Sequence, residues 1–512
     1  MPMTDPERIP VIIGGGQVND RPARDIDGQE PVALMALSLR AAMRDGAVGP
    51  DDIDHVAIVD QLSFRDDPDL GPPLAQLVGL DAGKVRLVPG LHGDTPIRLL
   101  NEAANRIGAG ESQIEAVVGG EALRTSGARK QAELAARQER ASEKMLGFGA
   151  QTNALRNLAE KVKPNYLNAH GLATPVDVYP LYENAGRAAY GQTLAAAQQE
   201  SAAIWSLMSQ IAAANDGAWI RRPEDAATIL TVSEENRPIA FPYTKLMVAN
   251  ASVNQSAAFV VASLAEARRR GIAENHIIYV GMGSAAKEPA NILKRDRYDR
   301  SVSMDTAIRR CLILNGMTVD DLDFVELYSC FPCVTKMARR TLGWPVDKPA
   351  TVFGGLTFGG APLANYMSHA VVSMVSKLRT EGRTGFLFAN GGFATDNHCI
   401  VLSNQPIAAA QFPQDFDYRA EADAVREPIP PLDEDYIGPA TIETYTVFYR
   451  RDGTPRAGVV VARTIDGART LAHVDVADTA MMAFLTDAMV EPVGTAGMVV
   501  TDMAGRRVWR RH

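Results

Sequence analysis

The chain has 512 residues, of which 46% are hydrophobic and 22% charged, and its formal net charge is −9. This length predicts two to four domains, and the negative charge argues against a nucleic-acid partner. Four scattered cysteines argue against a disulfide framework and favour a reducing compartment. We expect no signal peptide, because the first residues lack an apolar core, and no apolar run in the sequence reaches membrane-spanning length. We therefore expect a cytoplasmic protein without a transmembrane segment.

Strand and helix patterns alternate over the first 125 residues. Helical spacing marks residues 31–43 and 97–107, and short apolar runs predict strands at 11–13, 56–59, 85–88 and 114–118. Such alternation predicts α/β layers around a largely parallel sheet. Gly14, Gly15 and Gly16 follow the first run, but they are only a weak dinucleotide signal because the spacing is wrong and no helix opens from them.

The character of the chain changes between residues 124 and 238. Residues 128–161 are rich in helix formers, and 184–215 is a second helical block, so we expect a helical insertion. Arg124, Arg129 and Lys130 cluster at its start. They form either a solvated helix face or a clamp for phosphate groups.

Strand–helix alternation then resumes. We predict helices at 251–269 and 305–315, and strands at 277–280, 324–327, 386–388 and 400–402. Residues 406–439 hold many prolines and acids and predict an extended linker. From residue 442 onward the pattern is β-like, and we expect a small β-barrel there.

A glycine-rich loop at residues 354–362 runs into a helix over 363–378, with Pro362 in the expected first turn. The free N–H groups of such a helix start offer a site for an anion or an oxyanion. The loop at residues 89–96 repeats this arrangement before the helix at 97–107, with Thr95 as an expected cap. Two similar halves would bring both helix starts to one pocket.

Four stretches in this order resemble motifs of the thiolase superfamily. They are VVGGE (117–121), FPYTKLMVANASVNQSAA (241–258), VELYSCF (325–331) and GGLTFGGAPL (354–363). The likeness is strongest to sterol-carrier-protein-type thiolases and their bacterial thiolase-like relatives, some of which carry an extra C-terminal domain. It implies a duplicated five-layer αβαβα core with a helical loop domain. The expected parts are 1–270 with the loop domain at 124–238, 271–405, a linker at 406–439, and a β domain at 440–512.

The resemblance also implies acyl transfer through a nucleophilic cysteine at the start of the first buried helix. A histidine in a G-H-P loop and a second cysteine in a C-x-G loop would complete that chemistry. Here Gly93 stands at about the place of the nucleophile, Ala361 replaces the histidine, and Ala389 begins the C-x-G loop. We therefore expect thiolase (acyltransferase) activity to be weak, altered or absent.

Several residues are left as candidates for chemistry. His92 is a base, an oxyanion donor or an ordinary loop histidine, and Tyr328 is an oxyanion donor or a structural tyrosine. Cys330 is the candidate reactive thiol, and with Cys333 it forms a C-x-x-C pattern outside its usual context. The expected substrate contacts are Gly93, Thr95, Asn254, Gly359, Gly360, Ala361, Asn390 and Gly391. We expect no metal site.

Three functions follow from these observations. The first is a protein that binds a coenzyme A thioester, as substrate or ligand and without a covalently bound cofactor, and runs a retro-aldol, lyase or hydrolytic step or only binds it. The second is an acyltransferase of lipid metabolism with Cys330 as nucleophile. The third is a non-enzymatic scaffold whose C-terminal domain recruits a partner protein or lipid. The sequence does not decide whether the protein is a homodimer or a monomer.

Overall fold

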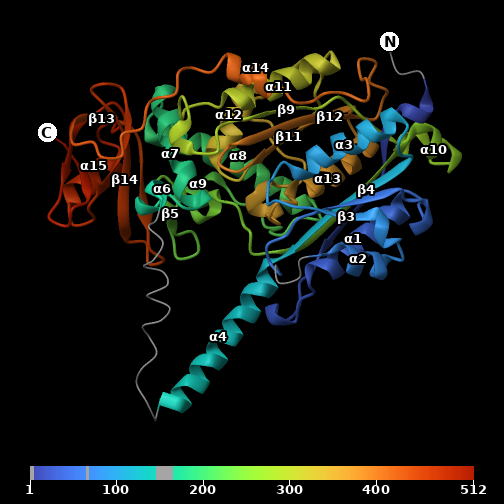
Figure 1. Cartoon of the computed structure of the whole chain (residues 1–512), viewed down its shortest axis with the longest axis horizontal. Helices are drawn as coiled ribbons and strands as arrows, with labels where there is room; N and C mark the ends of the chain where they lie inside the picture. Colours follow the sequence, from blue (N-terminus) through green and yellow to red (C-terminus); the bar gives the residue numbers. More distant parts are fainter. Residues whose placement is uncertain (1–4, 65–68, 146–164, 512) are drawn as a thin grey trace.

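The centre of the structure is a ten-stranded sheet whose two halves pack on opposite sides of two buried helices, α3 (Thr95–Ala109) and α13 (Tyr366–Thr380) (Figure 1). The computed structural model describes residues 5–64, 69–145 and 165–511. Strand order in the first half is β3 (Val85–Val88), β2 (His55–Val59), β4 (Ile114–Ala122), β7 (Asn254–Ser263), β1 (Pro10–Asn19). The second half continues with β8 (Ile278–Val280), β12 (Asp396–Ser403), β11 (Thr384–Gly391), β10 (Phe324–Leu327), and β9 (Ser284–Lys287) pairs with β12.

Helices cover both outer faces and complete five αβαβα layers, as the sequence predicts. The first half is covered by α1 (Pro31–Asp45), α2 (Gly71–Val78) and α10 (Leu264–Arg269). The second half is covered by α11 (Val302–Asn315), α12 (Pro332–Leu342) and the short α14 (Arg419–Ala424) of the predicted linker. Among the described residues, no helix has both the length and the apolar character needed to cross a membrane.

A helical region follows β4, as predicted. It contains α4 (Leu123–Met145), α6 (Tyr166–Ala169), α7 (Pro175–Ala189), α8 (Leu194–Ala214), α9 (Ala226–Leu230), and the short strands β5 (Pro238–Ala240) and β6 (Tyr243–Thr244). Figure 1 shows α4 extending from the end of β4 away from the sheet. The rest of the helix predicted at 128–161 lies outside the described residues.

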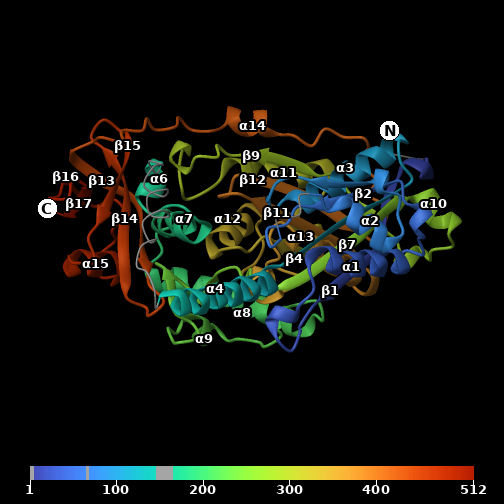
Figure 2. The ribbon, with the colours of Figure 1, turned by 60° about the horizontal axis from the view of Figure 1, so that its bottom comes forward.

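The C-terminal region forms a closed five-stranded barrel at one end of the molecule, which confirms the predicted β domain (Figure 2). Its strands are β13 (Gly438–Tyr449), β14 (Pro455–Thr464), β15 (Arg469–Val474), β17 (Arg507–Arg511) and β16 (Ala496–Thr501), and α15 (Thr479–Thr486) packs against β13. The barrel closes because β13 pairs with both β14 and β16. The division of the chain at residues 270, 405 and 439 stays a prediction.

Two sequence predictions about the sheet are wrong. The sheet was expected to be largely parallel, but six of the nine strand pairings described in it are antiparallel. The expected helix at 251–269 is strand β7 followed by the short helix α10. All ten residues of β7 are buried between β1 and β4, with helices on both faces of the strand. Small side chains are needed on both faces, so the strand shows no alternation of apolar and polar residues. Gly14 and Gly16 lie inside β1, where an added Cβ would stand 2.1 Å from the carbonyl oxygen of Ala42 and 2.3 Å from that of Ser38. These glycines therefore let α1 approach the strand and form no nucleotide loop.

A buried arginine holds the barrel to the core. The Arg469 guanidinium donates to the carbonyl oxygens of Leu293 and Arg295 at 2.7 and 2.6 Å, and to both carboxylate oxygens of Glu443. Arg469 has no exposed surface, so these bonds form away from water. The C-terminal domain is therefore fixed on the core by a polar contact that is costly to break.

We expect Arg469→Met to lower the free energy of unfolding by about 3–5 kcal/mol, because it leaves two buried carbonyl groups without this donor and removes the buried partner of Glu443. Urea unfolding measures this loss. Arg463→Met is the matched control, since Arg463 bonds the same Glu443 at 2.9 Å but is about a third exposed. Its loss should stay near or below about 1 kcal/mol. Equal losses for the two variants would contradict the role assigned to Arg469.

Candidate functional site

The loop that leads into α3 places three adjacent residues, His92, Gly93 and Asp94, at the start of a buried helix. Asp94, and not Thr95 as predicted, occupies the N-cap position, and its side chain makes no capping hydrogen bond. The loop is closed by a backbone bond from Thr95 to the carbonyl oxygen of His92 at 3.2 Å. The positive end of the α3 dipole therefore faces this loop.

Gly93 is crowded at the place where a nucleophilic side chain was expected. A Cβ added to Gly93 would stand 2.3 Å from the Tyr328 hydroxyl and 2.3 Å from the carbonyl oxygen of Asn390. Gly391 is equally tight, since its added Cβ would stand 2.8 Å from Oδ1 of Asp94. Tyr328 and the end of β11 thus fill the space that a cysteine at residue 93 would need.

His92 is paired with a buried carboxylate that the sequence reasoning missed. Its Nδ1 lies 3.0 Å from Oδ2 of Asp396, at the start of β12, and the Lys287 ammonium lies 2.7 Å from the other carboxylate oxygen. The hydrogen bond to Asp396 raises the pKa of His92. Burial acts to raise the pKa of Asp396, but the bonds from His92 and Lys287 lower it to about 2. His92 is therefore a stronger base than a free histidine, and its ring is half exposed.

Asp94 completes a compact polar group. It is 7% exposed, and burial together with the charge of Asp396 raises its pKa to about 6. Its Oδ1 has no hydrogen-bond partner among the described residues. In the β11–β12 hairpin, Gly391 pairs with Asp396. The polar run Asp396-Asn397-His398, which follows the glycines at 391–392, is the sequence feature that could have indicated this group.

Tyr328 lies between the starts of the two buried helices. Its ring lies 5.8 Å from that of Tyr366, the first residue of α13, while its hydroxyl faces Gly93. Tyr366 in turn donates to Glu326 at 2.6 Å. Burial raises the pKa of Tyr328 well above its ordinary value, so the hydroxyl stays protonated and is available as a donor.

Glu326 organises the segment that precedes the glycine loop. Its carboxylate is fully buried and accepts bonds from Thr351 Oγ1 at 2.8 Å and from the backbone of Val352 at 2.9 Å. Burial raises its pKa to about 7 against the lowering effect of these donors. The segment then makes a turn of π-helix at Gly355–Gly359, and α13 begins at Tyr366, four residues later than the predicted start at Pro362.

The thiols of Cys330 and Cys333 are buried in an aromatic cluster. Burial raises the pKa of Cys330 to about 12 and that of Cys333 well above its ordinary value. Tyr179 stacks on Phe331 with ring centroids 4.5 Å apart and accepts a weak bond from Cys333 on its carbonyl oxygen. This environment holds both sulfurs as thiols, whereas a nucleophile or a redox pair requires a lowered pKa.

The structure brings only part of the predicted site together. His92, Gly93, Thr95, Tyr328, Asn390 and Gly391 surround the start of α3. The side-chain amide of Asn390 bonds Tyr179 and Asn397 at 3.1 and 2.9 Å. The backbone carbonyl of Asn390 is the group that faces Gly93.

The other predicted contacts are engaged elsewhere. Asn254 bonds Thr125 at 2.9 Å, the carbonyl of Gly359 accepts from Gln255 at 2.9 Å, and an added Cβ on Gly360 would meet Gln255 at 2.1 Å. The backbone N–H of Ala361 donates to Asn250 at 2.9 Å. Arg124 and Arg129 of the proposed phosphate clamp pair with Asp25 and Glu30.

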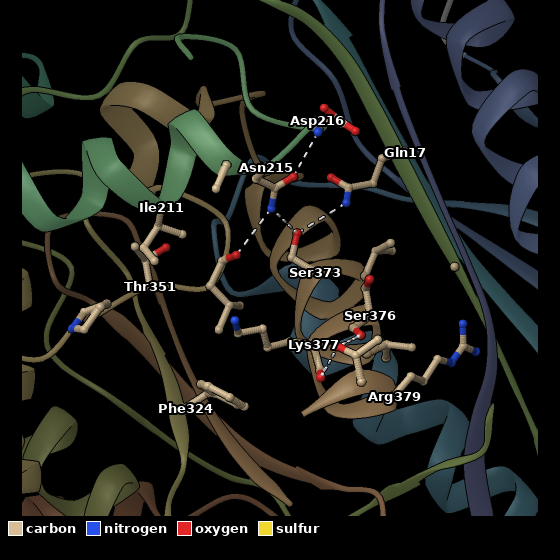
Figure 3. Close-up of a pocket in the computed structure, with 18 of the residues that line it drawn as sticks. Gln17, Ile211, Asn215, Asp216, Phe324, Thr351, Ser373, Ser376, Lys377 and Arg379 are labelled. Atoms are coloured by element: carbon tan, nitrogen blue, oxygen red, sulfur yellow. Dashed lines mark hydrogen bonds between the residues drawn. The ribbon is translucent and has the colours of Figure 1, made fainter. Parts of the chain in front are cut away.

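A cavity of about 930 Å³ lies apart from these residues (Figure 3). It is lined by β1, the end of α8, the start of β10 and the second half of α13. Gln17 and Asn215 both donate to Ser373 Oγ on its wall, at 3.3 and 3.2 Å. None of the predicted site residues lines this cavity.

Comparison with known proteins points to one superfamily. A family model described as the thiolase-like protein type 1 additional C-terminal domain matches residues 421–504. A monomeric SCP2-thiolase-like protein type 1 from Mycobacterium smegmatis is similar over 99% of this chain and 100% of that chain, with TM-score 0.80 and 28% identity. Among curated proteins, no sequence match was found.

More distant structures share the fold alone. An Ltp2–ChsH2(DUF35) aldolase matches with TM-score 0.58 and 15% identity, over 78% of this chain and 99% of that chain. Human mitochondrial 3-ketoacyl-CoA thiolase in complex with CoA matches with TM-score 0.54 and 15% identity, over 78% of this chain and 98% of that chain.

We expect Gly93→Ala to lower the free energy of unfolding by about 1–3 kcal/mol, because the new methyl group overlaps Tyr328 and the Asn390 carbonyl. Gly127→Ala is the control, since nothing lies within 4 Å of a Cβ added there and the residue is in helix α4. The control should be neutral or stabilising by up to about 1 kcal/mol. Denaturant unfolding distinguishes the two, and a neutral Gly93→Ala variant would show that the site has room for a side chain.

The raised pKa of Glu326 predicts a pH dependence of stability. The folded state keeps the Glu326 proton up to about pH 7, whereas the unfolded state releases it near the ordinary glutamate pKa of 4.5, so this group stabilises the fold at low pH. Its contribution, on the order of 3 kcal/mol, is lost as pH rises from about 4.5 to 7. Glu326→Gln should remove that part of the pH dependence in urea unfolding. If the free energy of unfolding changes with pH in the same way in wild type and variant, the role assigned to Glu326 is wrong.

Proposed function

Because this chain belongs to the thiolase superfamily and carries the additional C-terminal domain of type 1 thiolase-like proteins, we propose that it binds a coenzyme A thioester at the start of α3 and cleaves a carbon–carbon bond without a cysteine nucleophile. The observation that carries the proposal is the crowding at Gly93, where Tyr328 and Asn390 take the space of a nucleophile. The CoA complex of one fold relative and the aldolase title of another support the choice of ligand and reaction.

The reaction class is a retro-aldol cleavage of a β-hydroxyacyl-CoA. His92 accepts the proton of the β-hydroxyl group through Nε2, because its Nδ1 bonds Asp396. The O–H electron pair forms the new carbonyl, the Cα–Cβ bond breaks, and its electron pair moves to Cα as the thioester enolate. His92 then returns the proton to Cα. The products are a shorter CoA thioester and an aldehyde or ketone.

Two features of the site stabilise the enolate. The Tyr328 hydroxyl, kept protonated by burial, donates to the enolate oxygen. The N–H groups at the start of α3 add the positive end of the helix dipole. Asp396 stabilises the imidazolium that forms while His92 holds the proton, because the pair is 3.0 Å apart.

Binding without catalysis is the alternative that the close packing favours. Tyr328 and Asp94 are each less than a tenth exposed, and neither lines the 930 Å³ cavity. A protein that only binds the thioester would show heat with acyl-CoA and no proton chemistry. The same experiment therefore separates the two functions.

We expect the protein to bind acetyl-CoA in calorimetry and to exchange its α-hydrogens for deuterium in D₂O, read by mass spectrometry. Exchange is the reverse half of the proposed reaction, since it needs the same base and enolate. His92→Gln and Tyr328→Phe should each slow exchange by about 100-fold or more and leave acetyl-CoA affinity within a few-fold. His55→Gln, an exposed histidine on β2, is the control.

Three outcomes would count against this proposal. Absence of heat at millimolar acetyl-CoA would exclude the ligand. Binding without exchange would favour the non-catalytic function. Acylation of the protein that disappears in Cys330→Ser would show a covalent route through the buried thiol.

A further inference from the structure

His92, Asp94 and Asp396 place three metal-binding side chains together. One nitrogen or oxygen atom from each lies within 4.8 Å of the others. Two come from the loop before α3 and one from the start of β12, about three hundred residues later in the chain. The two carboxylates are buried, whereas the histidine ring is half exposed and open to solvent. The group is thus rigid on one side and accessible on the other.

An unsatisfied oxygen in this group gives an independent indication of a ligand. Asp94 is 7% exposed, and its Oδ1 has no hydrogen-bond donor among the described residues. Asp94 is the N-cap residue of α3, but its side chain makes no bond to the first turn of the helix. A buried carboxylate oxygen without a donor is costly unless a proton or a cation binds it.

The charges around the group leave room for a cation. Asp94 and Asp396 carry two negative charges when ionised, and Lys287 supplies the one ammonium in direct contact, at 2.7 Å from Asp396. Arg98 acts on Asp94 only at a distance, and its guanidinium is paired with Glu102 at 2.7 Å. Lys287 is half exposed at the end of a flexible chain, so it can move away from Asp396.

The donor set selects the kind of cation. One imidazole nitrogen and two carboxylate oxygens suit Zn²⁺, which is commonly held by three protein ligands with a fourth position left for water. Ca²⁺ and Mg²⁺ prefer sites made of oxygen alone. We infer that His92, Asp94 and Asp396 form a binding site for a divalent transition-metal cation, with Zn²⁺ as the best match.

Such a cation would regulate the site rather than assist it. Binding uses a lone pair of His92, the group that accepts the substrate proton, so the bound cation and the base exclude each other. Zn²⁺ should therefore inhibit α-hydrogen exchange, and a chelator should restore it. This consequence rests on the proposed function, whereas cation binding does not and can be measured without any thioester.

The test is calorimetric titration of the full-length, chelator-treated protein with Zn²⁺, with the visible spectrum of Co²⁺ as a second readout of coordination. Asp94→Asn and His92→Gln should each weaken binding by at least about tenfold. Lys287→Gln should strengthen binding by roughly fivefold, because it removes a competing positive charge beside Asp396. His55→Gln should leave the affinity unchanged.

The sign of the Lys287→Gln effect makes the test robust to folding defects, since a damaged site cannot bind more tightly. No Zn²⁺ binding at millimolar concentration, or affinity unchanged in both Asp94→Asn and His92→Gln, would overturn the metal site. Weaker binding in Lys287→Gln would overturn the charge argument that supports it. Zn²⁺ binding without inhibition of exchange would separate the metal site from the proposed reaction and leave only the site standing.

Discussion

Close approach of helices to the central strands is the constraint on which the rest of the structure depends. α1 lies on β1 with no room for a Cβ at Gly14 or Gly16, and the start of α13 lies on β4 in the same way. An added Cβ on Gly119 would stand 2.3 Å from the side chain of Asn365, which itself bonds the Gly119 carbonyl. These contacts fix α1 and the start of α13 relative to the sheet, so the loop before α13 is held at a fixed position.

The same crowding explains what sequence reasoning could and could not predict. Short apolar strands with polar flanks, such as β2 and β3, were predicted from their pattern, as were the duplicated halves and the terminal barrel. β7 was taken for a helix because a strand pressed between helices on both faces needs alanine, which is also the best helix former. Local propensity and tertiary crowding select the same residue here, so composition cannot distinguish the two structures.

The sequence predicted the loops that form the candidate site, but not the charged residues that surround His92. The glycine loops and a helix over residues 97–107 follow from local sequence, although the helix begins two residues earlier, and Tyr328 and His92 were identified as candidates. Asp396 and Lys287 join them only through the pairing of β12 with β11 and β9, which brings together residues far apart in the chain. Gly359 and Ala361 matched a motif, but the carbonyl of Gly359 is engaged by Gln255 and the N–H of Ala361 by Asn250. A motif therefore predicts chain shape better than it predicts which groups remain available.

The start of α3 shows how one physical requirement is met by different chemistry. In the superfamily, the positive end of this helix stabilises a thiolate. In this chain the Tyr328 hydroxyl occupies the space that the cysteine side chain would need. Asp94 and Asp396 supply the negative charge in place of the thiolate. Carboxylates are poor nucleophiles toward thioesters but good partners for an imidazole or a cation. We propose that this exchange of one anion for another at the same helix end moves the site from covalent acyl transfer toward proton transfer.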